Sequence, residues 1–171
     1  FWTQMFANRL MNYLAMSDVA LTSFEDRIGR DLSIEEYQGG AYEPLAARYI
    51  PDPGIRALSL NVLQRLSTGV VDAKMARAIG VVCAANGIQL SVVLARNLRE
   101  PEVAGQNTVL LGSRRANPWI GMFEDRLNFQ TVFQESPHLA SFTNRAPRAG
   151  EAREYPGNFD RTCYCRVAFL R

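Results

Sequence analysis

Hydrophobic and polar positions along the chain alternate between helical and strand-like spacing. The clearest helical period lies in residues 67–87, STGVVDAKMARAIGVVCAANG. Ser67 or Thr68 is expected to cap this helix, Asp72 suits the positive end of its dipole, and Asn86-Gly87 supplies a stop. Its apolar residues predict a buried stripe made of Val71, Met75, Ala78, Ile79 and Val82.

The first fifty residues contain shorter patterns. Residues 1–16 predict a segment that begins as a helix and continues as a buried strand, and the partial alternation of residues 17–24, SDVALTSF, predicts another short strand. In DLSIEEYQGG, Ser33 as N-cap and Glu36 three positions later form a capping box, and the two glycines end the helix.

Prolines divide the next region into two predicted helices. One helix ends before Pro51, the segment PDPG forms a turn, and a second helix runs from about Ile55 to Leu66.

The second half of the chain is rich in strand-like runs. Residues 88–96, IQLSVVLAR, and 108–112, TVLLG, are nearly continuous apolar runs, which is typical of strands covered on both faces. Between them, NLREPEVAGQ is expected as a connector. Residues 130–134 and 161–170 add two strand candidates, separated by a long loop with a short strand near LASF.

This order of elements predicts an α/β fold with a Rossmann-like three-layer open sheet, mostly parallel, with helices on both faces. A chain of 171 residues is long enough to bury its own core, so we expect a single α/β domain over residues 1–171. It begins FWTQMF without a methionine or signal peptide and stops within a strand-like pattern, which favours a fragment of a longer parent chain.

Composition excludes several classes of function. The net charge of +2 is too small to indicate nucleic-acid binding by this region, and no run reaches the roughly 18 apolar residues of a membrane span. Cys83 reads as a core residue, and Cys163 with Cys165 does not make a zinc site. His138 reads as a loop residue, so neither a catalytic set nor a metal site can be assembled, and catalytic residues stay unknown.

The best candidate for a binding site is the loop in NTVLLGSRRANPWIGMFEDRLNF. A strand ends at Gly112, Asn117 is expected as N-cap, and a helix starts at Pro118. Gly112 allows a tight turn that turns backbone amides outward, Ser113 adds a hydroxyl, and the guanidinium groups of Arg114 and Arg115 fit phosphate or carboxylate. The alternative is that GSRRAN is only a well-made turn with solvated arginines.

Two other residues are expected to converge on this loop. Arg96 follows the preceding strand at its C-terminal end, provided that the two strands are parallel. Asn144 lies in the long later loop, where it either reads the edge of a ligand or closes an Asx-turn.

Three segments carry a resemblance to a group of largely uncharacterised bacterial proteins. GSRRANPW, FEDRLNF and NRAPRAGE are similar to the group's pattern G-S-x-R-x-N-P-W, F-E-x-x-L-N-F and N-x-x-P-x-x-G-E. Its recurrent positions correspond to Gly112, Ser113, Arg115, Asn117, Trp119, Asn128, Asn144 and Glu151. The resemblance implies a Rossmann-like domain, often joined to an N-terminal membrane segment or to a winged-helix DNA-binding domain. The chain would then be the soluble part of a membrane-tethered sensor or regulator.

A shorter similarity links GSRRAN to the phosphate loop G-S-x-R-x-x-S of flavodoxin-like FMN reductases. The final serine is missing, and that loop normally follows the first strand of its fold.

Three functions therefore stay open. The leading expectation is a sensory or regulatory domain that binds a small anion at residues 112–117. The second is an enzyme acting on a nucleotide or flavin, and the third is a structural or assembly module without a small ligand. A nucleotide or another phosphate-containing molecule is the kind of ligand expected, and a protein partner or a homo-oligomer fits any of the three.

Overall fold

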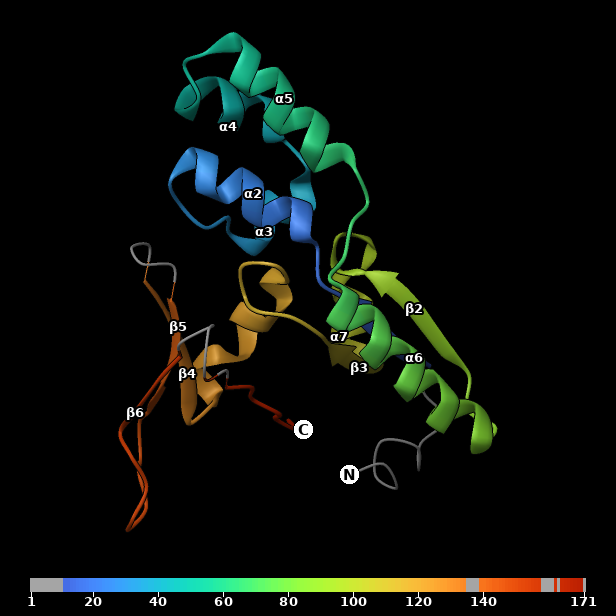
Figure 1. Cartoon of the computed structure of the whole chain (residues 1–171). Coiled ribbons are helices and arrows are strands. Elements are labelled where there is room, and N and C mark those ends of the chain that lie inside the picture. Colours follow the sequence, from blue (N-terminus) through green and yellow to red (C-terminus); the bar gives the residue numbers. More distant parts are fainter. Residues whose placement is uncertain (1–10, 135–138, 158–161, 163, 171) are drawn as a thin grey trace. The chain divides into compact units, whose positions relative to one another are not determined.

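The computed structural model describes residues 11–134, 139–157, 162 and 164–170 (Figure 1). The chain forms two compact units, Phe1–Gly121 and Met122–Arg171, called here the N-terminal and C-terminal units. It is an α/β protein, as predicted, with one parallel and one antiparallel sheet. The expectation of a single domain over the whole chain stays a prediction.

The N-terminal unit contains a parallel sheet of three strands, in the order β2-β1-β3. They are β1 (Asn12–Met16), β2 (Leu90–Leu94) and β3 (Asn107–Leu110). Leu14 in the central strand lies opposite Val92 of β2 and Val109 of β3. The predictions of a buried strand within residues 1–16 and of strands within 88–96 and 108–112 are confirmed, whereas the helix expected at the start lies outside the described residues.

Helices cover both faces of β1. On one face, Leu14 packs against α6 (Val70–Ala85). On the other, Ala15 belongs to a cluster against which Val103 of α7 (Glu100–Gly105) packs. The helix α7 lies in the segment NLREPEVAGQ, which was expected as a connector without a helix of its own.

Four helices stand between β1 and α6 in the chain: α2 (Val19–Ile28), α3 (Ile34–Gly39), α4 (Tyr42–Tyr49) and α5 (Pro53–Gln64). The strand predicted at residues 17–24 is wrong. Ala20, Leu21, Phe24 and Ile28 are the buried apolar positions of α2, and their spacing follows the period of a helix rather than the alternation of a strand. Phe24 packs edge-to-face on Tyr42 of α4.

The capping box of α3 is confirmed. The Ser33 hydroxyl accepts from the amide of Glu36, and the Glu36 carboxylate accepts from the amide of Ser33. Asp52 caps α5, so Pro53 starts this helix and PDPG is not a separate turn.

The prediction for α6 is only partly right. Gly69 is its N-cap, without a side-chain bond from Ser67 or Thr68, and Asp72 lies in its first turn as expected. The predicted buried stripe is wrong except for Ile79: the sheet side buries Ala76, Ile79 and Cys83, whereas Val71, Met75, Ala78 and Val82 are exposed.

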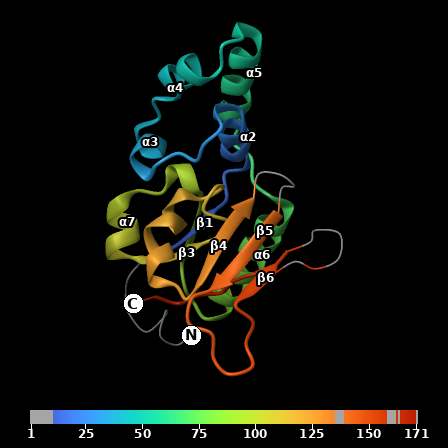
Figure 2. The same cartoon turned by 90° about the vertical axis from the view of Figure 1, so that its left-hand side faces the viewer.

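The C-terminal unit is built on an antiparallel sheet of β4 (Phe129–Gln134), β5 (Leu139–Asn144) and β6 (Glu154–Pro156), which can be followed in Figure 2. The strands expected at 130–134 and near LASF are confirmed. The strand expected over residues 161–170 is wrong for the described residues 164–170, which are irregular.

Candidate functional site

The order of the three parallel strands, β2-β1-β3, singles out the carboxyl ends of β1 and β3 as a possible ligand site. The helix leading into β2 covers one face of the sheet and the helix leading into β3 contributes to the other, so the connections diverge between β1 and β3. Ligands in open α/β sheets bind at such a point, beyond the carboxyl ends of the strands. Here these ends lead into Ser17 and Gly112.

Ser17 lies where three segments meet. A Cβ placed on Gly112 would come within 2.8 Å of the Ser17 Cβ, and Gly112 has a φ of 103°, so this position favours glycine for two separate reasons. The Ser17 hydroxyl lies 3.4 Å from that of Thr68, just before α6, and its amide donates to the Asp72 carboxylate at 3.0 Å. The end of β1, the start of α6 and the loop after β3 therefore form one cluster.

The loop after β3 is a tight turn with an exposed outer edge. The Ser113 carbonyl accepts from the amides of Ala116 at 3.1 Å and Asn117 at 2.8 Å. Gly112, Ser113 and Arg114 are exposed, and within the described part of the chain their backbone amides have no acceptor. These donors are therefore available to an anion or to water.

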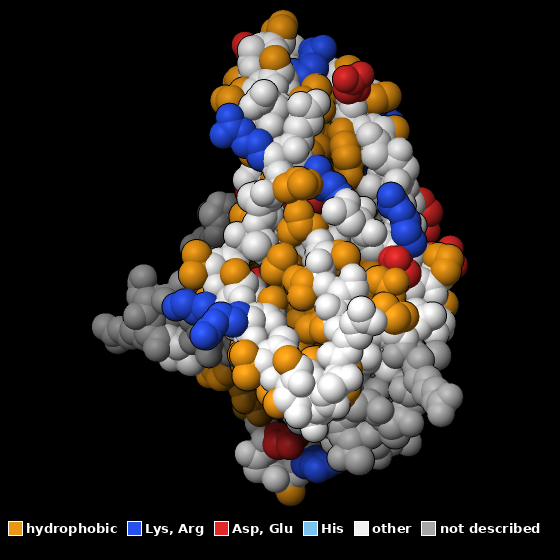
Figure 3. Space-filling view, turned by 90° about the vertical axis from the view of Figure 1, so that its right-hand side faces the viewer, with side chains coloured by type: hydrophobic (Ala, Val, Ile, Leu, Met, Phe, Trp, Pro, Cys, Tyr) orange, Lys and Arg blue, Asp and Glu red, His pale blue; other side chains and the backbone are white. Residues whose placement is uncertain are grey.

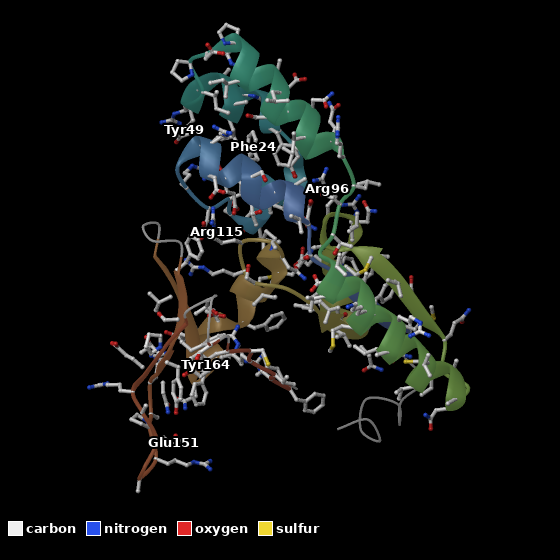
Figure 4. The ribbon with its side chains drawn as sticks, viewed as in Figure 1. Phe24, Tyr49, Arg96, Arg115, Glu151 and Tyr164 are labelled. Carbon is white, nitrogen blue, oxygen red and sulfur yellow. The ribbon has the colours of Figure 1, made fainter. Side chains whose placement is uncertain are left out.

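Arg115 is held firmly by several acidic side chains of the same chain. Its guanidinium contacts Asp26 at 2.7 Å, Asp31 at 3.1 Å and Glu25 at 3.5 Å, and its side chain is 13% exposed. Figure 4 shows it beneath α2. Burial alone would lower the pKa of Arg115, but these carboxylates raise it overall, so the charge persists.

Arg114 is held much more loosely. Its guanidinium lies 3.3 Å from Asp31, and the two side chains are 46% and 41% exposed. An exposed ion pair of this kind contributes about 0–1 kcal/mol, so a ligand can displace it at little cost.

Glu25 lies at the inner side of this cluster and is 1% exposed. The amide of Leu32 donates to its Oε1 at 2.9 Å, whereas its Oε2 accepts no hydrogen bond among the described residues. Burial, with a smaller contribution from nearby Asp31, raises the pKa of Glu25 to about 8. Burial therefore shifts Glu25 toward its protonated form, while the contact with Arg115 opposes that shift.

Arg96 is engaged in a second buried ion pair. Its Nε donates to Asp18 Oδ2 at 2.7 Å, and its NH1 donates to the Leu63 carbonyl at 2.7 Å. The Tyr37 hydroxyl donates to the same Asp18 oxygen at 3.2 Å, and burial together with Asp18 raises the pKa of Tyr37. Because Asp18 is fully buried, this pair ties the end of β2 to the helices that precede α6.

Arg96 also lines a hollow of about 310 Å³, near the lower limit for small-molecule pockets. Gly40, Tyr42, Leu63 and Gln64 are among its other lining residues, and the loop 112–117 does not take part. The parallel arrangement of β2 and β3 on which the expectation for Arg96 depended is confirmed, since both strands pair in parallel with β1. Arg96 lines this hollow, whereas the loop 112–117 does not.

Asn117 directly precedes the helix that begins at Pro118, as predicted, but its side-chain oxygen accepts no hydrogen bond among the described residues. Its Nδ2 donates to the carbonyl of Leu111 at 3.0 Å, so the side chain closes the loop back onto β3. The helix that follows is a 3-10 helix, η2 (Pro118–Arg126), in which Trp119 donates to the carbonyl of Ala95 at 3.0 Å.

Asn144 belongs to the C-terminal unit, where it closes a hairpin. Its Oδ1 accepts from Asn128 at 2.7 Å, and its Nδ2 donates to Glu151 at 3.0 Å. Glu151, labelled in Figure 4, also accepts from the amide of Arg148 at 2.9 Å, and these bonds lower its pKa. Three recurrent positions of the resembling pattern thus form one hydrogen-bonded group. The convergence of Asn144 with the loop 112–117 stays a prediction.

Sequence reasoning missed Ser17, Asp18 and Tyr37. Ser17 and Asp18 had been assigned to a strand. The sequence did contain a signal for them, because Ser-Asp directly follows a buried strand and precedes apolar residues at helical spacing, which is typical of a helix start. Cys83 is buried, as expected, and His138 and Cys163 lie outside the described residues.

The described residues contain neither a metal-binding cluster nor a membrane-spanning helix. No group of three or more His, Cys, Asp or Glu residues there has a geometry that could hold a metal ion. None of the helices in that part of the chain has the length and apolar character needed to cross a bilayer. Comparisons with protein-family models, with curated proteins and with solved structures found no match.

Proposed function

We propose that the N-terminal unit is a sensory or regulatory domain of Rossmann-like type that binds a small anionic ligand at the carboxyl ends of β1 and β3. The observation that carries this proposal is the exposed edge formed by Gly112, Ser113 and Arg114, whose amides have no acceptor in the described chain, beside the point where the sheet connections diverge. Phosphate or carboxylate suits such donors best.

The two arginines have different roles in this proposal. Arg114 leaves Asp31 and contacts the ligand, because its present ion pair is long and exposed. Arg115 stays among its three carboxylates and fixes the loop against α2. Ser113 supplies a hydroxyl to the same ligand.

The regulatory part of the proposal rests on the link between loop and helices. Asp31 lies in the connection between α2 and α3 and contacts both arginines. When a ligand binds Arg114, Asp31 loses one of its two arginine partners. The segment between α2 and α3 can then move away from the loop more easily. Ligand binding would therefore shift the population toward a form of the domain in which this segment is displaced. The resemblance to membrane-tethered regulators agrees with this role.

Thermal unfolding of the full chain tests the proposal, with a panel of FMN, NAD, ATP, nucleotide sugars and inorganic phosphate. A ligand present at 100 times its dissociation constant adds about 2.7 kcal/mol of stability, which raises the melting temperature by roughly 5 °C or more. Arg114→Ala should reduce this shift strongly. The matched control, Arg65→Ala, removes an exposed arginine whose side chain hydrogen-bonds only Asn61 in the described structure, and should leave the shift unchanged.

One observation favours a second function, a structural or assembly module. Arg115 is held by carboxylates of the chain itself, as expected if GSRRAN serves only to join the sheet to α2. No melting shift with any compound, together with a lower melting temperature for Arg115→Ala alone, would favour this second function.

A further inference from the structure

The helix α6 has more apolar surface than the sheet covers. Most of its residues fall into three rows with the same spacing, each displaced from the next by one residue and therefore by about 100° around the helix. The row that faces the sheet contains Asp72, Ala76, Ile79 and Cys83. The next row contains Val71, Met75, Ala78 and Val82, and we call it the outer stripe.

The outer stripe lies on the surface. Val71 is 72% exposed, Met75 47% and Val82 36%, and Ala78 is exposed as well. Figure 3 shows hydrophobic side chains gathered over the face of the N-terminal unit that is turned toward the viewer. An apolar row with i, i+4, i+7 and i+11 spacing is the surface that one helix presents to another, and the small Ala78 allows close approach.

The third row gives this surface a charge. It contains Val70, Lys74, Arg77 and Val81, and both basic residues are exposed. The only acidic residue between Pro53 and Arg99 is Asp72, whose carboxylate accepts from the Ser17 amide on the sheet side. The outer stripe is therefore bordered by positive charge without a neighbouring acid on α6 to neutralise it.

This charge discriminates between possible occupants. In an antiparallel two-fold pair of α6 helices, the row with Lys74 and Arg77 would face its own copy, and like charges would oppose each other. A bilayer surface is typically entered by Trp, Phe and Leu, whereas the outer stripe consists of Val, Ala and Met. A helix with one apolar row and one acidic row matches both the spacing and the charge.

We propose that the outer stripe of α6 is the docking site for an amphipathic helix of a partner protein, whose Asp or Glu residues lie against Lys74 and Arg77. This inference is independent of the anion site, because it uses no residue of the loop 112–117.

Fluorescence anisotropy of a labelled synthetic peptide, titrated with the full chain, tests this docking site. The peptide is an amphipathic helix of roughly 20 residues, long enough to be partly helical alone, with Leu in one row and Glu in the adjacent row. The matched peptide carries Lys in place of Glu. The Glu peptide should bind at least roughly tenfold more tightly, and Lys74→Glu with Arg77→Glu should reverse the preference.

A second set of variants locates the contact. Met75→Gln should weaken binding of the Glu peptide roughly tenfold, since it replaces an apolar contact at the centre of the stripe. Leu58→Gln, at a position 62% exposed on α5, is the control and should have no effect. Both substitutions are on the surface, and circular dichroism verifies that the variants stay folded.

Four results would overturn the proposal. The first is no binding of the Glu peptide, and the second is equal binding of both peptides. The third is a dimer of the full chain in light scattering that Met75→Gln dissolves, which would assign the stripe to a second copy. The fourth is co-sedimentation with phosphatidylglycerol vesicles that Met75→Gln abolishes, which would assign it to a membrane surface.

Discussion

Replacing Glu25 by glutamine is expected to remove a pH dependence from the folding of the N-terminal unit. Glu25 is buried, and one carboxylate oxygen accepts the Leu32 amide while the other accepts no hydrogen bond among the described residues. Glutamine has the same shape, stays neutral at every pH, and offers an amide oxygen to Leu32. Glu25→Gln therefore removes the ionisation and keeps the bond to Leu32, and besides this it changes only the contact of Oε2 with Arg115, which is 3.5 Å long.

The size of the effect follows from the pKa. Burial is the main cause that raises the pKa of Glu25 from its ordinary value of 4.5 to about 8. The folded state therefore keeps the proton to a higher pH than the unfolded chain does, so the stabilisation is complete below about pH 4.5 and is lost as the pH rises through about 8. At about 1.4 kcal/mol for each pKa unit, the free energy of unfolding falls by about 5 kcal/mol across this range.

Urea unfolding of the full chain, followed by circular dichroism between pH 5 and pH 8.5, measures this dependence. The free energy of unfolding of the wild type should fall more steeply than that of Glu25→Gln, by about 1.4 kcal/mol per pH unit between about 5 and 8. Asp26→Asn, at an exposed position that also contacts Arg115, is the control and should keep most of the wild-type slope, because Asp26 is the smallest of the causes that raise the pKa of Glu25. Parallel pH profiles for wild type and Glu25→Gln would refute the reasoning.

Three further predictions concern stability in urea. Gly112→Ala should lower the free energy of unfolding by about 2 kcal/mol or more, because it strains a φ of 103° and collides with Ser17, whereas Gly105→Ala, with open space around it, should not destabilise. Arg96→Met should lower it by about 3 kcal/mol by leaving the Asp18 carboxylate buried without its cation; a loss below 1 kcal/mol would contradict the buried pair. In the C-terminal unit, Arg166→Met should lower it by about 2 kcal/mol and reduce a loss of stability in acid. Burial alone would raise the pKa of Glu124, but hydrogen bonds from Arg166 and from the Thr131 amide lower it overall. The stabilisation by this ion pair is therefore present above about pH 4.5 and is lost as the pH falls; unchanged acid sensitivity would argue against this pair.

Features that depend on neighbours in the sequence were predictable. The capping box of α3 needs only Ser33 and Glu36, three residues apart, and both of its hydrogen bonds form. The strands β2 and β3 were visible as apolar runs because they are covered by other elements on both faces.

The errors arose where tertiary contacts override a local pattern. The predicted buried stripe of α6 contained Ile79 but missed the rest of its row, in which Ala76 and Cys83 are buried. The carboxylate of Asp72 binds the Ser17 amide, and the small Ala76 and Cys83 let the helix approach Leu14. Together these contacts turn α6 by about one residue, or 100°, from the predicted orientation.

The candidate site shows the same limit. The sequence identified Gly112 as a tight turn, and its φ and its contact with Ser17 explain why glycine is needed there. It did not indicate that Asp26 and Asp31, more than 80 residues earlier, supply the anions of Arg115. Long-range pairing of charges leaves no periodic signal in a single sequence.

The position of β1 has a consequence for how the protein folds during synthesis. Asn12 in this strand pairs with Leu90 and with Asn107, so its hydrogen-bonding partners are made 78 and 95 residues later. At ordinary rates of translation, several seconds pass between the synthesis of β1 and that of its pairing strands. During this time α2 to α5 are already complete and can pack against one another. Pairings this distant in the chain also slow folding, because a long loop must close before the contact stabilises anything. Formation of the parallel sheet is therefore expected to be the late and rate-limiting step, with its central strand exposed to chaperones or to aggregation until residue 94 has left the ribosome.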